Sequence, residues 1–311
     1  MKRLLLLVAA IGLTTAAVTV SRDRGSPSTD PTGNLSVAVE DRNPWTHLRL
    51  NNDPADFQFA IVSDRTGGHR PGIFRRAVDV LNLLQPQFVL SVGDLVEGYT
   101  QDRAVLDAQW REFAAEVGRL QMPFFYVPGN HDLSNRAMTR FWRERYGRRY
   151  YHFVYRDVLF LVLNSDDPPG GDGGIGSHQM ESVRQALTEN AAVRWTVVCL
   201  HRPLWAQADV ETNGWLAVEA ALADRPYTVF AGHEHSFRKY VRQGRDYYQL
   251  ATTGGESPLR GVAHGEFDQV AWVTMKKDGP RLANVLLDGI YPADLKRQGG
   301  GETHFSGAAA R

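Results

Sequence analysis

The sequence predicts an α/β fold in which helices flank one mixed β-sheet or two stacked mixed sheets. From residue 56, short apolar runs alternate with helix-like segments, the pattern of a parallel sheet. Beyond Phe237, strands follow one another with only turns and one loop between them, the pattern of an antiparallel sheet. The 311 residues suffice for one large domain, which we place at 56–290.

Local signals mark each element in turn. A strand at 57–63 precedes a helix at 72–84 that ends at Gln85-Pro86. Ser134 is the expected N-cap of a later helix and Gly147 its end. The remaining expected elements are a strand ending at Asp94, a helix at 101–119, a strand before Gly129, a hairpin at 150–163, a helix at 177–190, a strand ending at His201, a helix at 215–223 and a strand ending at His233.

Composition excludes several classes of function. Lys plus Arg equals Asp plus Glu at 35 each, so no whole-chain basic field attracts nucleic acid or an anionic membrane. The single cysteine, Cys199, permits no internal disulfide. A Gly-Lys-Ser/Thr phosphate loop is absent from the sequence. We therefore predict a small-molecule substrate and no nucleic-acid partner, with the oligomeric state left open.

The N-terminus predicts export to the periplasm or the exterior. Residues 1–20 combine basic Lys2-Arg3, an apolar run and small residues at Thr15-Ala16-Ala17, as in a signal peptide. The alternative is an uncleaved membrane anchor, because apolar character extends over about 17 residues, the lower limit for a span. Residues 21–55 are expected to form a polar linker, and 291–311 a polar C-terminal tail.

Five of the predicted strands end in side chains that bind metal ions. The carboxyl ends of parallel strands meet at one edge of a sheet, where ligands bind. The donors at these ends are carboxylates, an amide oxygen and imidazoles, a set that suits iron, manganese or zinc. They are Asp64, Asp94, Asn130, His201, His233 and His235, with His131 and Asp132 directly after Asn130.

The order of these residues resembles that of the calcineurin-like metallophosphoesterases, which include the purple acid phosphatases. The resemblance covers about residues 57–290 and rests on Asp64, Gly93-Asp94, Gly129-Asn130-His131-Asp132, His201 and Gly232-His233-Glu234-His235. It implies a four-layer sandwich, in which two stacked mixed sheets are flanked by helices around a dinuclear metal site.

The resemblance also implies two metal sites that share one bridging carboxylate. They would consist of Asp94 as the bridge, Asn130, His201 and His233 on one ion, and Asp64 and His235 on the other. Hydroxide held between the ions would attack phosphorus. His131 would protonate the leaving group, with Asp132 orienting it.

Phosphate oxygens call for hydrogen-bond donors, and guanidinium groups match them bidentately. The candidates are Asn130 and the arginines Arg65, Arg70, Arg202 and Arg260, of which Arg202, next to His201, is the strongest.

The first motif departs from the family. Most members have Asp-x-His there, whereas this chain has Asp64-Arg65-Thr66. Purple acid phosphatases lack that histidine and use a tyrosine three residues after the bridging aspartate, a position held here by Glu97. We therefore predict Glu97 as a ligand of the first ion, the alternative being a weakened first site.

These observations predict an exported hydrolase of phosphate esters that binds two divalent or trivalent ions. A phosphomonoesterase is favoured, with a phosphodiesterase a close second. The shape of the pocket loops decides between the two activities. The rival hypothesis is a catalytically degraded relative that binds metal or phosphate without turnover. The missing first-motif histidine favours that rival, and the intact His131 counts against it.

Overall fold

The computed structural model describes residues 27–29, 35–38, 41–48, 50–51 and 53–290. The chain divides into two compact units, Met1–Asn52 and Asp53–Arg311. In the first unit, β1 (Pro27–Thr29) pairs antiparallel with β2 (Ser36–Ala38), inside the segment predicted as a linker. The predicted signal at 1–20 and the tail at 291–311 lie outside the described residues. Within the described residues, no helix has the length and apolarity needed to cross a membrane.

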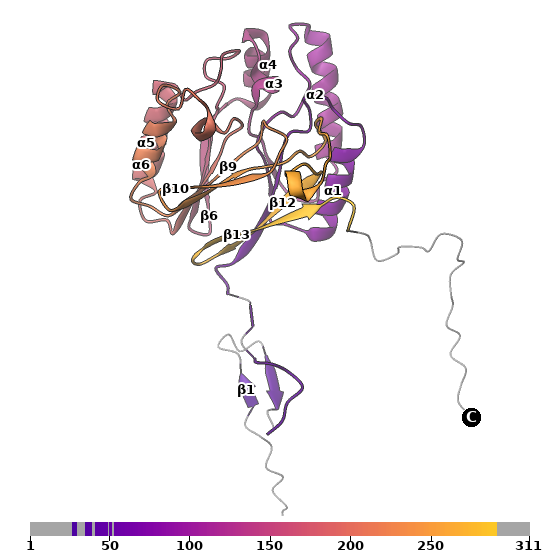
Figure 1. Ribbon diagram of the computed structural model, residues 1–311, viewed down its shortest axis with the longest axis vertical. Coiled ribbons are helices and arrows are strands. Elements are labelled where there is room, and N and C mark those ends of the chain that lie inside the picture. The colour runs from indigo at the N-terminus through magenta and orange to yellow at the C-terminus, as the bar shows by residue number, and fades with distance from the viewer. Residues whose placement is uncertain (1–26, 30–34, 39–40, 49, 52, 291–311) are drawn as a thin grey trace, which may run out of the picture. The chain divides into compact units, whose positions relative to one another are not determined.

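The second unit contains two mixed β-sheets (Figure 1). One has the order β10-β11-β9-β8-β7-β6, and the other the order β13-β12-β3-β4-β5. The first is built from β6 (Tyr151–Tyr155), β7 (Val158–Val162), β8 (Trp195–Cys199), β9 (Tyr227–Ala231), β10 (Arg238–Arg242) and β11 (Arg245–Gln249). The second is built from β3 (Phe57–Val62), β4 (Val89–Ser91), β5 (Phe124–Phe125), β12 (Gln269–Lys276) and β13 (Gly279–Leu286).

In both sheets, strands from the alternating part of the chain pair in parallel, and the two strands of each hairpin pair antiparallel. The β10–β11 hairpin joins its sheet through the parallel pair β9–β11. The pairs β3–β4, β4–β5, β7–β8 and β8–β9 are parallel. The pairs β6–β7, β10–β11, β3–β12 and β12–β13 are antiparallel. The predicted mixture of sheet types is therefore confirmed.

Helices cover the outer faces of both sheets (Figure 1). On one side, α1 (Ile73–Leu84), α2 (Arg103–Val117) and α4 (Arg136–Tyr146) share a core with β3 and β4. On the other side, α5 (Ser177–Glu189) and α6 (Trp215–Leu222) share a core with β7, β8 and β9. The four-layer sandwich is confirmed.

The strands have two buried faces, which explains why they read as continuous apolar runs. In β3, Phe57, Phe59 and Ile61 point into the core between the sheets, and Phe59 meets Phe160 of β7 edge-on at 5.2 Å between ring centroids. The alternate residues of β3, Ala60 and Val62, belong to the core beneath the helices.

Of the two predicted caps of α4, the C-terminal one is confirmed and the N-terminal one is wrong. Gly147 ends the helix as predicted, with φ 75°, a conformation that glycine adopts readily. The N-cap is Asn135 rather than Ser134, because the Asn135 side chain accepts hydrogen bonds from the N–H groups of Ala137 and Met138. A short helix that the sequence did not predict, α3 (Asn130–Leu133), precedes this cap.

Candidate metal centre

The chain turns sharply where each strand delivers its donor side chain. The backbones of Asp64, Asp94, His233 and His235 have φ values of 43°, 57°, 76° and 52°. The left-handed region is unfavourable for residues with a Cβ and occurs at functional sites where the surrounding structure imposes it. The fold therefore forces these side chains toward one point at the ends of β3, β4 and β9.

Gly129 lets two of the donor loops approach each other. A Cβ on Gly129 would overlap the Asp94 carboxylate and come within 2.9 Å of Cγ of His201. The N–H of His131, two residues along this turn, donates to Asp94 Oδ1 at 2.9 Å and fixes the carboxylate. The Pro-Gly turn of the sequence thus has a steric reason.

The first donor group surrounds Nε2 of His201. Asn130 Oδ1 lies 2.8 Å from this nitrogen, while Asp94 Oδ2 and His233 Nδ1 each lie 3.1 Å from it. The other ring nitrogen, Nδ1, donates a hydrogen bond to the Val92 carbonyl at 2.9 Å. This hydrogen bond orients Nε2 toward the other donors, as second-sphere partners of metal-binding histidines do.

The second donor group contains Asp64, Asp94 and His235, whose ligand atoms lie within 4.8 Å of one another. Nδ1 of His235 donates to the Glu256 carbonyl at 2.6 Å, and Nε2 faces Asp64 Oδ1 at 3.6 Å. Asp64 is held by the N–H of His233 at 2.8 Å and by the hydroxyl of Ser63. Asp94 belongs to both groups, in the bridging position that the sequence predicts.

The electrostatics of the cluster call for a cation. Burial raises the pKa of Asp64, whereas for Asp94 the imidazoles of His201 and His131 outweigh burial and lower the pKa to about 2. Burial would lower the pKa of His201, but Asp94 and Asp64 raise it to about 10. The protonated imidazole of His201 then supplies the positive charge between two buried carboxylates, a role that a metal ion would take over. The residues present therefore fit two ions.

Glu97 lies outside both groups. Its carboxylate accepts a hydrogen bond from the N–H of His69 at 2.6 Å, and Oε2 is 4.0 Å from Nδ1 of His131. The opposite nitrogen of that ring, Nε2, faces Asp94 at 4.0 Å, so Glu97 is on the far side of the imidazole from the donors. At the first motif, Gly67 instead brings its backbone beside His235, with no side chain in between.

His131 lies beside the donors, and its ring is oriented by Glu97 rather than by the predicted Asp132. The Glu97 carbonyl accepts the proton of His131 Nδ1 at 2.7 Å, which leaves Nε2 directed toward Asp94. Asp132 does not hold this ring. Its buried carboxylate accepts hydrogen bonds from the N–H groups of Leu95, Val96 and Gly129, so it ties the two donor loops together.

Of the predicted phosphate-binding arginines, Arg202 alone reaches the donors among the described residues. Its Nη1 lies 3.2 Å from His233 Nε2, and its Nε donates to Asp166 at 2.8 Å. The others have partners elsewhere: Arg65 pairs with Glu112, Arg70 with Asp268, and Arg260 with Glu266.

Sequence reasoning missed two neighbours of the site. Asp166 follows an apolar strand run and Asn164-Ser165, the same signal that marked Asp64 and Asp94, but the glycine-rich loop beyond it obscured this. Tyr99 accepts a hydrogen bond from Asn130 Nδ2 at 2.9 Å, and its ring meets His131 edge-on at 4.8 Å. No local pattern distinguishes this exposed tyrosine.

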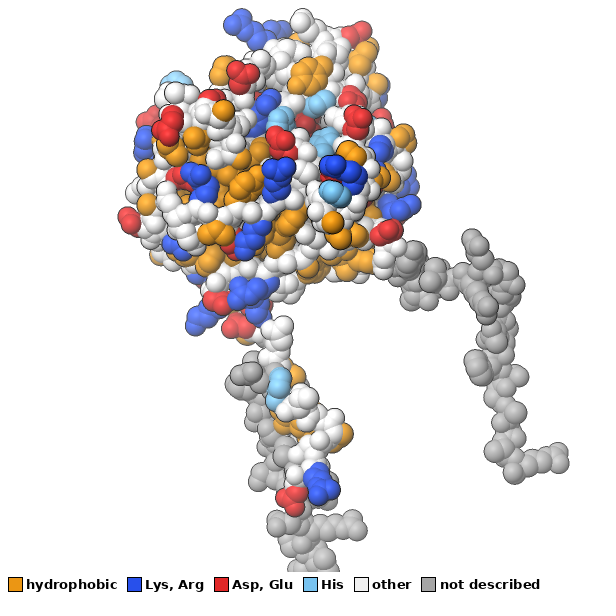
Figure 2. Space-filling model, viewed as in Figure 1, with side chains coloured by type: hydrophobic (Ala, Val, Ile, Leu, Met, Phe, Trp, Pro, Cys, Tyr) orange, Lys and Arg blue, Asp and Glu red, His pale blue; other side chains and the backbone are white. Residues whose placement is uncertain are grey.

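The site opens to solvent through a cavity of about 620 Å3 lined by Gly67, His233, His235 and Glu256, among others. Figure 2 shows histidine side chains gathered on this face of the molecule, with acidic and basic side chains beside them. The cavity is more than large enough for a phosphate group and part of an organic substrate.

The family model described as calcineurin-like phosphoesterase matches residues 55–237. Among curated proteins, none matches the chain by sequence.

Solved structures with the same fold are distant in sequence. A dimetal phosphatase from Danio rerio has a TM-score of 0.55 at 17% identity, covering 74% of this chain and 96% of its own. A purple acid phosphatase from yellow lupin (Lupinus luteus) has a TM-score of 0.57 at 13% identity, covering 75% and 52%. GAP50, the anchor in the inner membrane complex of Plasmodium, has a TM-score of 0.56 at 12% identity, covering 75% and 85%.

The match to the family model spans more than half of the chain and includes the residues from Asp64 to His235. The structural neighbours agree with it in fold, and the donor groups agree with it in chemistry. The chain therefore belongs to the calcineurin-like phosphoesterase family and is a metallophosphoesterase.

Proposed function

We propose that this protein hydrolyses phosphate monoesters with two metal ions held by Asp64, Asp94, Asn130, His201, His233 and His235. The observation that carries the proposal is that Asp94 belongs to two donor groups at once. Two ions in such a site supply positive charge to the phosphoryl oxygens and lower the pKa of bound water.

His131 is the proposed acid for the departing oxygen. Because its Nδ1 proton is committed to the Glu97 carbonyl, a proton for the leaving group has to be carried on Nε2, which requires the imidazolium form. The Glu97 carboxylate lies 4.0 Å from Nδ1 of the same ring. This assigns Glu97 to the support of His131 rather than to metal binding.

Arg202 is the proposed donor to phosphate. The protonation of His233 determines whether Arg202 is free to donate, because the two side chains form a hydrogen bond. A neutral imidazole carries one N–H, so His233 accepts from Arg202 at Nε2 only while Nδ1 is protonated. A cation held by Nδ1 would leave the proton on Nε2, so the hydrogen bond from Arg202 to His233 would be lost. Asp166 still holds Arg202 through Nε, and Nη1 becomes available to a phosphate oxygen.

The reaction is tested with p-nitrophenyl phosphate and its bis ester, assayed with iron, manganese or zinc and after chelation. Faster turnover of the monoester with at least one metal, abolished by chelation, is the expected result. Preference for the diester would replace monoesterase by diesterase activity. Absence of turnover with every metal would favour a binding module, a role for which GAP50, described as an anchor, offers a precedent in the same fold.

We also propose that the protein acts after export. The support is the basic and apolar segment at 1–20, whose character is that of a signal peptide or anchor. Fractionation of producing cells, with N-terminal sequencing of the protein, would distinguish a cleaved signal from a retained anchor. Recovery of the intact chain in the cytosol would contradict export.

A further inference from the structure

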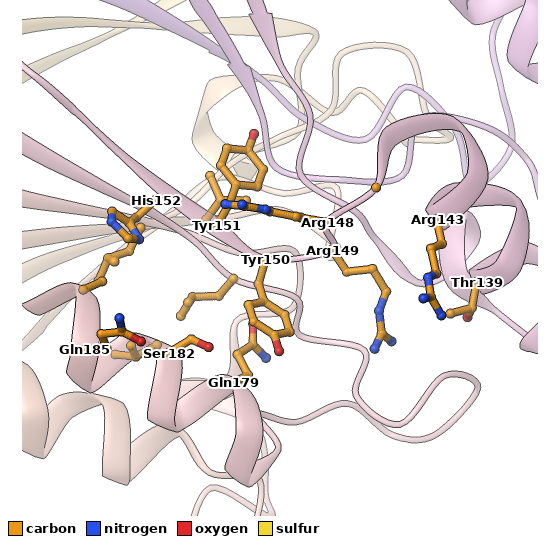
Figure 3. Close-up of a pocket in the computed structure, with 16 residues that line it drawn as sticks. Thr139, Arg143, Arg148, Arg149, Tyr150, Tyr151, His152, Gln179, Ser182 and Gln185 are labelled. Carbon is orange, nitrogen blue, oxygen red and sulfur yellow. The ribbon is translucent and has the colours of Figure 1, made fainter.

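A second cavity, of about 690 Å3, lies apart from the metal-binding residues (Figure 3). Its walls come from α4, the loop Gly147–Tyr150, the edge strand β6, strand β7 and α5. None of its lining residues belongs to either donor group. It is larger than the cavity of about 620 Å3 beside His233, and it is lined by arginines, whereas the cavity beside His233 is lined by glutamates.

Three arginines line this cavity. The side chains of Arg143, Arg148 and Arg149 make no hydrogen bond or ion pair with any described residue. By contrast, Arg202 and Arg242 are each paired with a buried carboxylate. In Figure 3, Arg149 extends into the space between Tyr150 and Arg143, so two guanidinium groups reach the same side of the cavity.

The local sequence concentrates this charge in a chain whose net charge is zero. Residues 136–149 contain six arginines and one acidic residue, Glu144, which pairs with Arg103 outside the segment. Unpaired guanidinium groups beside a concave surface attract anions, and their planar donors match phosphate oxygens bidentately. The cavity therefore has the electrostatics of an anion site.

An aromatic groove of about 490 Å3 adjoins the cavity and shares Gly147, Arg148, Tyr151 and His152 with it. The groove is formed where the two sheets end, because Phe125 of β5 stacks on Phe153 of β6 at 4.2 Å. Its other lining residues are aromatic: Phe124, Phe125, Tyr126, Trp142 and Tyr146. Such a surface accepts an aromatic ring by stacking or edge contact.

We propose that the cavity and the groove together form a nucleotide-binding site distinct from the metal centre. The phosphates of a nucleoside diphosphate would bind Arg143 and Arg149, and the base would enter the aromatic groove beside Arg148. Charge complementarity selects the phosphates, and Arg148, which lines both spaces, joins the two halves. The combined size of the two spaces suits a ligand of this kind.

The test uses the full-length, metal-loaded protein and a probe that resists hydrolysis, adenosine 5′-(α,β-methylene)diphosphate. Binding is measured by calorimetry for the wild type, for the double variant Arg143→Ala/Arg149→Ala and for Arg140→Ala. The last is a matched control, because Arg140 is an exposed arginine of α4 that does not line the cavity. Each titration is repeated after the metal has been removed by chelation, because binding at the metal centre requires the ions and binding to the arginines does not.

The expected result is a roughly tenfold or greater loss of affinity in the double variant, since two charge-assisted contacts disappear. The control should bind as the wild type does, and all three proteins should hydrolyse p-nitrophenyl phosphate at the same rate. Equal binding by the double variant and the wild type would overturn the site. Pyrophosphate binding as tightly as the nucleotide would overturn the role of the groove. Arginine-dependent binding to phosphatidylglycerol vesicles without nucleotide binding would also overturn the proposal, in favour of a membrane surface.

Discussion

The metal-binding edge and the arginine-lined cavity differ in how the fold treats their charges. At the metal-binding edge, Asp64, Asp94 and His201 are buried and hydrogen-bonded to backbone groups. In the cavity, Arg143 and Arg148 are exposed and have no protein partner among the described residues. The first region is organised before its ligand arrives, whereas the second leaves long side chains to order around a ligand.

This difference has a physical cause. A cation site requires several oxygen and nitrogen atoms within a few ångströms, and mutual repulsion among carboxylates prevents that unless the backbone imposes it. Positive φ values at Asp64, Asp94 and His233 show that imposition. Guanidinium groups on flexible stems need no such strain to surround an anion. The predictions below test this contrast, from the largest expected effect to the smallest.

Substituting Asp94→Asn should abolish the preorganised site. Because Asp94 belongs to both donor groups, we expect loss of bound metal and a fall in turnover well beyond the roughly 10–100-fold typical of second-sphere changes. Elemental analysis and p-nitrophenyl phosphate assays measure both effects. Asp79→Asn, at an exposed carboxylate of α1 paired with Arg119, is the control and should retain metal and activity. A metal-replete, active Asp94→Asn variant would refute the assignment.

Substituting Asp166→Asn should weaken the site without dismantling it. The change removes the charge that holds Arg202 at Nε, so kcat/KM should fall by roughly 10–100-fold while metal content is retained. Steady-state kinetics and metal analysis separate the two quantities. The adjacent Asp167→Asn is the matched control, since its carboxylate does not pair with Arg202. Equal kinetics for both variants would show that Asp166 does not position Arg202.

Stability measurements contrast a partnered arginine with an unpartnered one. Glu219→Gln removes the buried partner of Arg242 and should lower the free energy of unfolding by about 1–3 kcal/mol at pH 7. Arg149→Ala removes no hydrogen bond or ion pair with a described residue and should change it by less than about 0.5 kcal/mol. Urea denaturation of both variants gives these values. A larger loss for Arg149→Ala would indicate that the fold itself uses this arginine.

The Glu219 effect should also depend on pH. Burial raises the pKa of this carboxyl, but Arg242 and Tyr247 outweigh it and lower the pKa below the ordinary value. Its contribution to stability is therefore complete above the unfolded-state pKa and is lost as pH falls through the folded-state pKa. Wild type and Glu219→Gln should converge in stability in that acidic range. A difference that stays constant with pH would contradict the ion pair.

The smallest effect is expected for Glu97→Gln. Glutamine retains the oxygen that accepts from His69, and Glu97 is not among the metal donors. Elemental analysis should find the metal stoichiometry unchanged, and turnover of p-nitrophenyl phosphate should change only slightly. Loss of one ion from this variant would restore Glu97 to the ligands.

Much of the fold of this protein can be predicted from its sequence because the relevant signals are local. Apolar runs with two buried faces mark the strands, and donors placed just after Val62, Ser91 and Ala231 mark one edge of the fold. The glycines at 93, 129 and 232 indicate where the loops converge. The N-cap of α4 is harder to predict, since Ser134 and Asn135 are both residue types that cap helices. The structure uses Asn135.

The sequence by itself determined the layered α/β sandwich and the six donor residues, because strand ends and turn residues depend on neighbours in the chain. Only the tertiary structure placed Glu97 behind His131, set Asp166 against Arg202, and left Arg143 and Arg149 without a partner among the described residues in a cavity beside an aromatic groove. These relations join segments far apart in the chain. Whether a charge meets a ligand, a partner or solvent depends on packing, which no local pattern records.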